Sequence, residues 1–460
     1  MYEFLLLASC LLFVGVGIAY SRHEAASLLH PATIYLLFHG FIFVIRPIFA
    51  RIYGFDLVYR VYDFQPSLDD KITVILGANL AMVVFVAVSL RVASVSAQPV
   101  IAGGFDQLRR VLAGPILLAT AVLGPLAVAA QLSNWSRRID PYATMARDAA
   151  TGIMVNVEGN GWFSESALML APLSVLLVWL LRYRSWGWLL FAGASLLMLG
   201  SGGRGSFIFA ATALAFLYLL ERRRNWFDWR VMVLAAASFV SFNAVVVDRG
   251  AAIRGLLGGE AGDTYTSAID LDPLEHMDFA SLEYFEYIVY AVPQRTGSWD
   301  YFAHNLQILT EPIPRTMWKD KPIGSPVQFF KLWDYGTPIG MTISLPGAGW
   351  MSLGYLGIAI QAAIFAMLYG AAHSRLLTRS DDALPRLYYA LFAATSIVVF
   401  RDGILLTLLR QLPFYLGPLL LMHGILRFKR VRMVRQRSEE QPQTPLTPAE
   451  RRRDLASRTP

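Results

Sequence analysis

Four arginines stand at the ends of apolar segments, where a charged side chain is costly. Arg204 lies in the stretch LMLGSGGRGSFIFA, and the others are Arg46, Arg401 and Arg410. An arginine near a membrane span is tolerated where it lines a polar cavity or meets an anion. Its planar donor fork suits a phosphate or a pyrophosphate. We therefore predict that these arginines bind an anionic substrate held at one face of a membrane.

Each arginine also has a simpler explanation. Arg46 could extend its side chain along the span to the interface, and Arg410 could face a lipid headgroup. Arg401 could form an ordinary ion pair with its neighbour Asp402. For Arg204 the glycines of the turn make such an explanation weaker, and the four together favour an anion site.

A second cationic group lies in EPIPRTMWKDKPIGSPVQFF, residues 311–330. Its first two prolines keep the chain extended. Three cations follow at short spacing: Arg315, Lys319 and Lys321. They could form a phosphate clamp, or they could balance Glu311 and Asp320 in a solvated loop.

Candidate general bases lie in the same part of the chain. They are Glu283, Glu286, Asp300 and His304. A transferase must remove a proton from an acceptor hydroxyl, and a carboxylate or an imidazole near an apolar surface can be tuned for that step. We select Glu286 and His304 as catalytic candidates, together with Arg204 and Arg315.

A metal or an organic cofactor is not predicted. The DLD triplet of Asp270 and Asp272 invites a metal reading, but Asp272, Pro273 and Glu275 match an N-cap, a first-turn proline and a capping carboxylate. No His or Cys cluster has metal-ligand spacing, and no glycine-rich phosphate loop follows a strand.

The composition indicates the element type that must position these residues. Of 460 residues only 16% are charged and 55% are hydrophobic, whereas a soluble protein is about a quarter charged. We predict an all-α polytopic membrane protein. Windows near the length that crosses a bilayer give about eleven transmembrane helices. The predicted spans are 2–20, 31–50, 72–90, 111–131, 165–181, 186–202, 205–220, 231–247, 347–371, 387–402 and 403–426.

Lysine and arginine in the short loops predict the orientation. Basic segments such as RYR at 182–184 and ERRR at 221–224 fall on one side of the membrane when the chain is threaded through the eleven predicted spans, and that side is then the cytoplasm. The N-terminus is expected outside and the C-terminus inside. The single cysteine, Cys10, lies in the first span and has no intrachain partner.

These spans divide the chain into four predicted regions. Residues 1–247 form helices one to eight, 248–346 a large outer loop, 347–427 helices nine to eleven, and 428–460 a disordered, basic cytoplasmic tail. The large loop carries thirteen Asp or Glu against seven Lys or Arg. Stretches such as SLEYFEYIVYAV mix apolar and acidic residues at helical spacing, so we expect short helices at the membrane surface.

Three stretches resemble segments of the Wzy-type oligosaccharide repeat unit polymerases. GSGGRGSFIFA is similar to the small-residue and arginine turn that these enzymes share with O-antigen ligases. IPRTMWKDKP at 313–322 resembles a segment of their large outer loop, and TISLPGAGWMSLGYLGIAIQ at 342–361 resembles the entry to the following span. The family usually has more than eleven spans, so either a helix is missing from our count or the start of this chain departs from the pattern.

The resemblance implies a metal-independent glycosyltransferase of the GT-C type in the bacterial inner membrane. Its substrates would be glycans linked to undecaprenyl pyrophosphate, joined into O-antigen, capsule or exopolysaccharide at the periplasmic face. Arg204, Arg315 and Lys321 would neutralise the departing pyrophosphate, while Arg46 and Arg401 would hold the second lipid-linked glycan. Sugars would rest on Trp299, Trp318 or Trp333, although packing in the core is the simpler role for each.

Two alternatives remain open. An O-antigen ligase, which transfers finished glycan to the lipid A core, shares the arginine turn. A flippase or anion carrier would instead place ionisable residues deep in the spans, where the sequence shows almost none. The expected partners are lipid-linked glycans, membrane lipids and a polysaccharide chain-length regulator, and not nucleic acid.

Overall fold

The structure of the chain is a computed structural model. It describes residues 1–61, 63–139, 145–147, 154–156, 161–200, 204–227, 279–310, 312–313, 317–318, 342–379 and 381–440, together with 229, 232 and 275. The chain divides into two compact units, Met1–Pro418 and Leu419–Pro460.

The chain is an all-α multi-pass membrane protein, as predicted. In the described part, nine helices are long and apolar enough to cross a membrane: Tyr2–Ser21, Pro31–Tyr53, Leu68–Val92, Gly104–Trp135, Gly161–Leu180, Gly205–Arg222, Leu345–Thr378, Ala383–Asp402 and Leu405–Arg427. A tenth apolar helix, Ser185–Gly200, is shorter. Ten of the eleven predicted spans coincide with these helices, and the remaining span, 231–247, lies outside the described residues.

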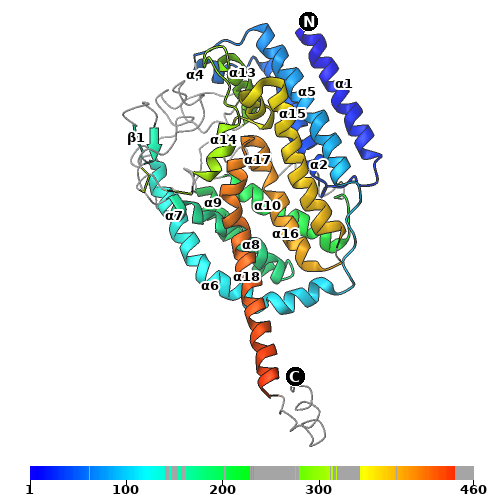
Figure 1. Cartoon of the computed structure of the whole chain (residues 1–460), viewed down its shortest axis with the longest axis vertical. Helices are drawn as coiled ribbons and strands as arrows, with labels where there is room; N and C mark the ends of the chain where they lie inside the picture. Colours follow the sequence, from blue (N-terminus) through cyan, green and yellow to red (C-terminus); the bar gives the residue numbers. More distant parts are fainter. Residues whose placement is uncertain are drawn as a thin grey trace, which may run out of the picture. The chain divides into compact units, whose positions relative to one another are not determined.

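The elements follow one another as mostly helical segments (Figure 1). The first half contains α1 (Tyr2–Ser21), α2 (Pro31–His39), the π-helix η1 (Gly40–Ile45), α3 (Arg46–Tyr53), α4 (Leu57–Val61), α5 (Leu68–Val92), α6 (Gly104–Ile139), α7 (Gly161–Ser166), η2 (Ala167–Met169), α8 (Leu170–Leu180), α9 (Ser185–Gly200) and α10 (Arg204–Arg222). The second half contains α13 (Ser281–Ala291), α14 (Ala303–Leu306), η4 (Gln307–Leu309), α15 (Leu345–His373), η6 (Ser374–Thr378), α16 (Ala383–Ala394), α17 (Ser396–Asp402) and α18 (Leu405–Glu440).

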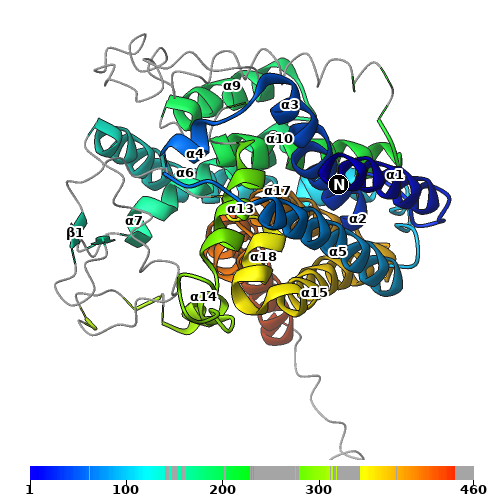
Figure 2. The same ribbon diagram turned by 90° about the horizontal axis from the view of Figure 1, so that it is seen from above.

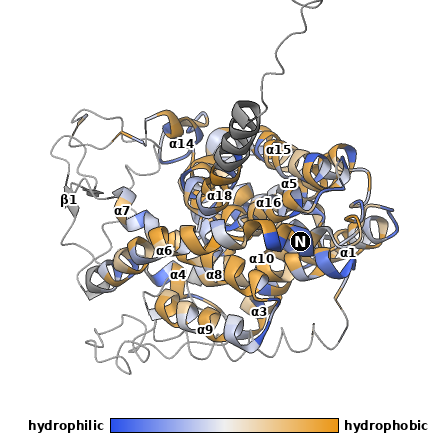
Figure 3. Ribbon diagram, turned by 90° about the horizontal axis from the view of Figure 1, so that it is seen from below, coloured by the Kyte–Doolittle hydropathy of each residue, from blue (hydrophilic) through white to orange (hydrophobic). Residues whose placement is uncertain are grey.

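One antiparallel pair of short strands interrupts the helices between α6 and α7. Strand β1 (Met145–Arg147) pairs with β2 (Met154–Asn156), with Ala146 opposite Val155. Apolar residues cover much of the outer helices, among them α6 and α9 (Figure 3), as expected for helices that face lipid.

The loops between the helices gather at two ends of the bundle. The N-terminal end, as we call it, holds the start of α1, the segment between α3 and α5, α13 and the start of α15. An ion pair from Arg51 to Glu3 joins α3 to α1 there. At the opposite end Leu28 donates its amide to Asn225, and Gln98 donates its amide to Leu377.

Two buried arginines hold the opposite end together. Arg386 donates to the carbonyls of Asp382, Gln98 and Leu377, and so joins three chain segments. Arg109 donates to the Trp179 carbonyl and forms an ion pair with Glu221 at 2.6 Å. The basic segments that the sequence assigned to one side therefore lie together at one end.

Helix α15 is broken near its start and folds back on itself. Leu353 and Gly354 have non-helical backbone angles, and Gly354 has a φ of +58°. A β-carbon on Gly349 would lie 2.5 Å from the Ile358 Cα, although nine residues of continuous helix would span about 13 Å. Residues 345–352 thus pack against the following turns, and glycine is required where the two backbones meet.

The break leaves backbone carbonyls without helical partners. The outer segment before α14 satisfies two of them, because Asp300 donates its amide to Met351 and Tyr301 donates to Ser352. The sequence predicted one uninterrupted span at 347–371. The structure instead provides a short helix that holds the Asp300 segment in place.

Helix α13 does not lie at the membrane surface, contrary to the expectation for this stretch of the large loop. Nearly every side chain from Ser281 to Ala291 is buried, including Glu283 and Glu286. The helix packs against α5 and α15. Its two carboxylates contact Arg46 and Tyr59 on distant segments. This mixed acidic and apolar sequence therefore lies in the interior of the protein.

Helix α18 extends further than predicted. It continues to Glu440, and so the first part of the expected disordered tail, residues 428–440, is helical. Residues 441–460 lie outside the described part of the chain.

Candidate functional site

Helices α7, α10, α17 and α18 meet at the N-terminal end of the bundle. A β-carbon on Gly205 in α10 would lie 3.4 Å from the Val398 side chain of α17. The Tyr415 ring of α18 stacks on the Phe209 ring of α10, with 3.8 Å between their centroids. Arg204 is the first residue of α10, so its backbone lies at this meeting point.

Two of the predicted substrate-binding arginines lie in the same region and remain partly open to solvent. Arg410 approaches Glu165 of α7 at 3.5 Å, and its side chain is 45% exposed. Arg401 approaches Asp402 at 3.4 Å and is 38% exposed. The expected pair between Arg401 and Asp402 is thus present, but both arginine contacts are long and accessible.

The turn between α17 and α18 is fixed tightly to the start of α15. The Ser344 amide donates to the Arg401 carbonyl at 2.7 Å. Gly403 has a φ of +71°, and a β-carbon there would lie 2.1 Å from the Ser344 carbonyl oxygen. Only glycine fits this position, and the resulting close contact fixes the backbone that carries Arg401.

His304 and Asp300 form a buried pair beside this turn. The His304 Nδ1 lies 2.6 Å from the Asp300 Oδ2, and the Asp300 Oδ2 also accepts the His304 amide at 3.3 Å. Because an ionised carboxylate only accepts, Nδ1 carries the proton and Nε2 of the neutral ring is an acceptor. Among the described residues Nε2 is buried and has no hydrogen-bond partner.

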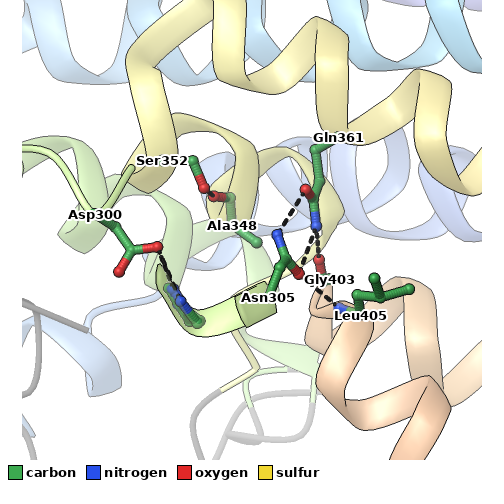
Figure 4. Close-up of polar contacts among 8 residues, drawn as sticks. Asp300, Asn305, Ala348, Ser352, Gln361, Gly403 and Leu405 are labelled. Atoms are coloured by element: carbon green, nitrogen blue, oxygen red, sulfur yellow. Dashed lines mark hydrogen bonds and ion pairs between the residues drawn. The ribbon is translucent and has the colours of Figure 1, made fainter. Parts of the chain in front are cut away.

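Asn305 and Gln361 connect the histidine segment to the α17–α18 turn (Figure 4). The Asn305 amide donates to the Gln361 Oε1 at 3.0 Å, and the Gln361 Nε2 donates to the Gly403 carbonyl at 2.7 Å. The Leu405 amide donates to the Asn305 Oδ1 at 2.8 Å. These bonds join the segment that carries His304 to the turn between Arg401 and Arg410.

A second group of charges lies between α3, α4 and α13. The Arg46 Nε contacts both carboxylate oxygens of Glu283, at 2.8 and 3.0 Å, and both side chains are almost fully buried. The Arg46 guanidinium also lies over the Phe55 ring, 5.1 Å from its centroid. The alternative that Arg46 extends to the membrane interface is therefore wrong, and its predicted role in substrate binding stays a prediction.

Glu286 lies one helical turn from Glu283 and is equally buried. The Tyr59 hydroxyl donates to its Oε2 at 2.5 Å. Burial raises the pKa of Glu286 from 4.5 to about 7, while Lys71 and the Tyr59 hydrogen bond oppose the rise. Burial and the carboxylate of Glu286 also raise the pKa of Tyr59, so the phenol stays a proton donor. Glu286 can therefore exchange a proton near neutral pH.

Glu275 attaches the same region to α4. Its Oε1 accepts the amides of Asp56 and Leu57 at 2.9 and 3.0 Å. The sequence assigned Glu275 to the capping of its own helix, whereas it caps the first turn of a helix more than 200 residues earlier. Residues 270–273, including Asp270 and Asp272, lie outside the described part.

Some of the predicted residues lie outside the described part of the chain, and two of the predicted tryptophans lie within it. Arg315, Lys319 and Lys321 lie outside the described residues, as does Trp333. Trp299 packs at a right angle on Trp350, with 5.6 Å between ring centroids, in agreement with the simpler core role. Trp318 is partly exposed.

The sequence reasoning missed Tyr59, Asn305 and Gln361. A polar residue inside a predicted span is a signal for Gln361, but the sequence offers no signal for its partners. No group of three or more His, Cys, Asp or Glu that could hold a metal ion occurs among the described residues. Comparisons with protein family models, curated proteins and solved structures find no match to the chain.

Proposed function

We propose that the chain polymerises oligosaccharide repeat units linked to undecaprenyl pyrophosphate, at the periplasmic face of the bacterial inner membrane. One observation carries the proposal: a buried His304–Asp300 pair, whose Nε2 has no hydrogen-bond partner in the described part of the chain, is joined through Asn305 to the turn between Arg401 and Arg410. A base and cations for a phosphorylated leaving group are both required for this reaction. In this proposal the N-terminal end faces the periplasm.

The chemistry follows from the placement of the two kinds of group. The His304 Nε2 accepts the proton of the acceptor sugar hydroxyl, and that oxygen forms a bond to the anomeric carbon of the donor. The bond between the anomeric carbon and the phosphate oxygen breaks, and undecaprenyl pyrophosphate leaves with the electron pair. Asp300 stabilises the imidazolium, and the arginines stabilise the charge that grows on the pyrophosphate.

His304 suits the role of base better than Glu286, the other predicted catalytic candidate. The Glu286 carboxylate already accepts a hydrogen bond from Tyr59 inside the packed helices α4 and α13. His304 leaves its acceptor nitrogen without a partner in the described part of the chain. The proposal therefore assigns proton removal to His304 and a structural role to Glu286.

A reconstituted reaction tests the proposal. Purified protein is incubated with a lipid-linked repeat unit, and the products are separated as ladders. We expect ladders from the wild type and a rate lowered by about 10²- to 10⁴-fold in His304→Gln. His23→Gln, at the opposite end of the bundle, is the matched control and should retain the rate. No ladder from the wild type, or equal rates in both variants, contradicts the assignment.

Gene deletion separates the polymerase from the ligase. Loss of the polymerase leaves lipopolysaccharide or capsule with single repeats. Loss of all polymer on lipid A, with lipid-linked polymer accumulating, favours the ligase. An unchanged chain-length distribution contradicts the polymerase.

One observation favours a carrier as the second candidate. His39 and His373 are fully buried within spans, and neither ring has a hydrogen-bond partner among the described residues. Buried ionisable side chains in spans are typical of transport pathways. Proteoliposomes with a pH-sensitive dye inside test this candidate: a proton flux that His39→Leu abolishes supports it, and a flux equal to that of empty liposomes contradicts it.

A further inference from the structure

The segment that carries His304 exposes an unusual number of large apolar side chains. Leu309 is 76% exposed and Met317 80% exposed, although neither lies in a membrane-spanning helix. Three further residues of the segment are also exposed: Tyr301, Leu306 and Ile313. Single exposed apolar residues are ordinary, but a concentration of them marks a surface that another apolar phase covers. We call the described residues of this segment, 301–310, 312–313 and 317–318, the surface strap.

The strap lies beside the membrane-spanning helices and not beyond their ends. In Figure 1, α14 lies at the height of the upper turns of α17 and α18, and Figure 2 places it next to α15 and α18. Asn305 joins it to Gln361 within α15 and to the first turn of α18. A segment at this height borders the same surroundings as those helices.

The helix to which the strap is joined, α15, also exposes large apolar side chains. Tyr355, Leu356 and Ile360 are exposed, large and apolar, and they lie on the span that also contains Gln361. Asn305 contacts Gln361, the residue after Ile360, so the strap is joined to the part of α15 that carries these exposed side chains.

The strap is also two-sided. Asp300 and His304 are buried against the protein, whereas the residues that follow His304 by two and by five positions, Leu306 and Leu309, are more than half exposed. An element with one face on the protein and a second, apolar face is typical of chains that lie in the membrane interface. Tyr301 and Trp318 have the amphipathic rings that prefer this depth.

We propose that the surface strap is embedded in the membrane leaflet at the N-terminal end, with Leu306, Leu309 and Met317 among the acyl chains of bulk phospholipid. His304, on the other face of the strap, is then held at the edge of the hydrocarbon. The inference does not depend on the proposed reaction.

Spin labels measure this placement directly. Cys10 is the only cysteine, so Cys10→Ser gives a background for Leu309→Cys and Met317→Cys. The nitroxide-labelled proteins are placed in nanodiscs of phosphatidylethanolamine and phosphatidylglycerol without isoprenoid lipid. The ratio of oxygen to nickel-chelate accessibility is recorded by electron paramagnetic resonance. Leu356→Cys serves as the lipid-facing control, and Asp69→Cys, exposed at the start of α5, as the water-facing control.

We expect the ratios at positions 309 and 317 to match that at 356 and to exceed that at 69 several-fold. Ratios that match position 69 overturn the proposal. A ratio that rises only after undecaprenyl phosphate is added assigns the surface to the substrate and also overturns it. Immobilisation that depends on protein concentration assigns it to a second copy, with the same consequence. Equal elution volume and helix content of all variants establish that they are folded.

Discussion

The buried carboxyl of Glu286 should make the stability of the protein fall as the pH rises. Its pKa is raised from 4.5 to about 7 in the folded chain, so the native state binds this proton more tightly than the unfolded state. The stabilisation is complete below the unfolded value and is lost as the pH passes through the folded value. A shift of about 2.5 units corresponds to about 3 kcal/mol.

The Glu286→Gln variant tests this reasoning. An amide keeps an acceptor for the Tyr59 hydroxyl but carries no charge at any pH. We expect the free energy of unfolding of the wild type to fall by about 3 kcal/mol between pH 4 and pH 8 relative to that of the variant. The measurement is helix loss by circular dichroism during titration of mixed micelles with dodecyl sulfate, at four pH values.

Two further variants test whether Lys71 lowers the pKa of Glu286. Lys71 and the Tyr59 hydroxyl both lower the pKa of Glu286. Lys71→Met should therefore move the midpoint of the stability change to higher pH. Glu3→Gln, which removes an exposed partner of Arg51, is the control and should leave the profile of the wild type intact. A Glu286→Gln profile parallel to that of the wild type would refute the assignment.

Three other substitutions have expected outcomes in the same unfolding titration. Gln361→Leu removes three hydrogen bonds and leaves the Gly403 carbonyl without its donor, so a loss of about 2 kcal/mol is expected; unchanged stability would contradict the hydrogen-bonded junction of Asn305, Gln361 and Gly403. Arg46→Met leaves the Glu283 charge buried and should cost about 3–5 kcal/mol, and adding Glu283→Leu should recover most of the loss. Gly403→Ala places a β-carbon against the Ser344 carbonyl at a left-handed φ, so a loss above about 2 kcal/mol is expected, and stability equal to the wild type would refute the contact.

Hydropathy was sufficient to predict the spans, because a bilayer requires a length of apolar helix that few other structures need. It was less reliable at the boundaries. Helix α5 starts at Leu68 and α6 at Gly104, several residues before the predicted spans. Polar first turns such as the Ser67 capping box extend a helix beyond its apolar part without changing the hydropathy signal.

The interior position of α13 could not be read from local sequence. The stretch SLEYFEYIVYA has an acidic residue on two successive turns, which favours a surface helix when the partners are unknown. In the structure Glu283 is paired with Arg46, 237 residues away, and Glu286 with Tyr59, 227 residues away. Burial of these carboxylates depends on contacts that only the tertiary fold creates.

The break in α15 is an intermediate case. Gly349, Gly354 and Gly357 are visible in the sequence and indicate a close approach or an unusual backbone angle. Their partners are not visible, because the approach of Gly349 to Ile358 exists only after the chain folds back. The sequence thus predicts an irregular helix at this entry to the span. The positions that the break gives to Asp300 and His304 are seen only in the structure.

The two groups of arginines at the N-terminal end differ in what an anion would have to displace. Arg46 is buried with Glu283 at 2.8 Å, and breaking such a pair costs about 3–5 kcal/mol. Arg401 and Arg410 have acidic partners at 3.4 and 3.5 Å and stay 38% and 45% exposed, and exposed pairs contribute only about 0–1 kcal/mol. A pyrophosphate that replaces the partners of Arg401 and Arg410 therefore loses little binding free energy. One that replaces Glu283 as the partner of Arg46 would lose most of its binding free energy in breaking the buried pair. On this comparison the α17–α18 turn would be the better anion site, and Arg46 would act through the position it gives to α13.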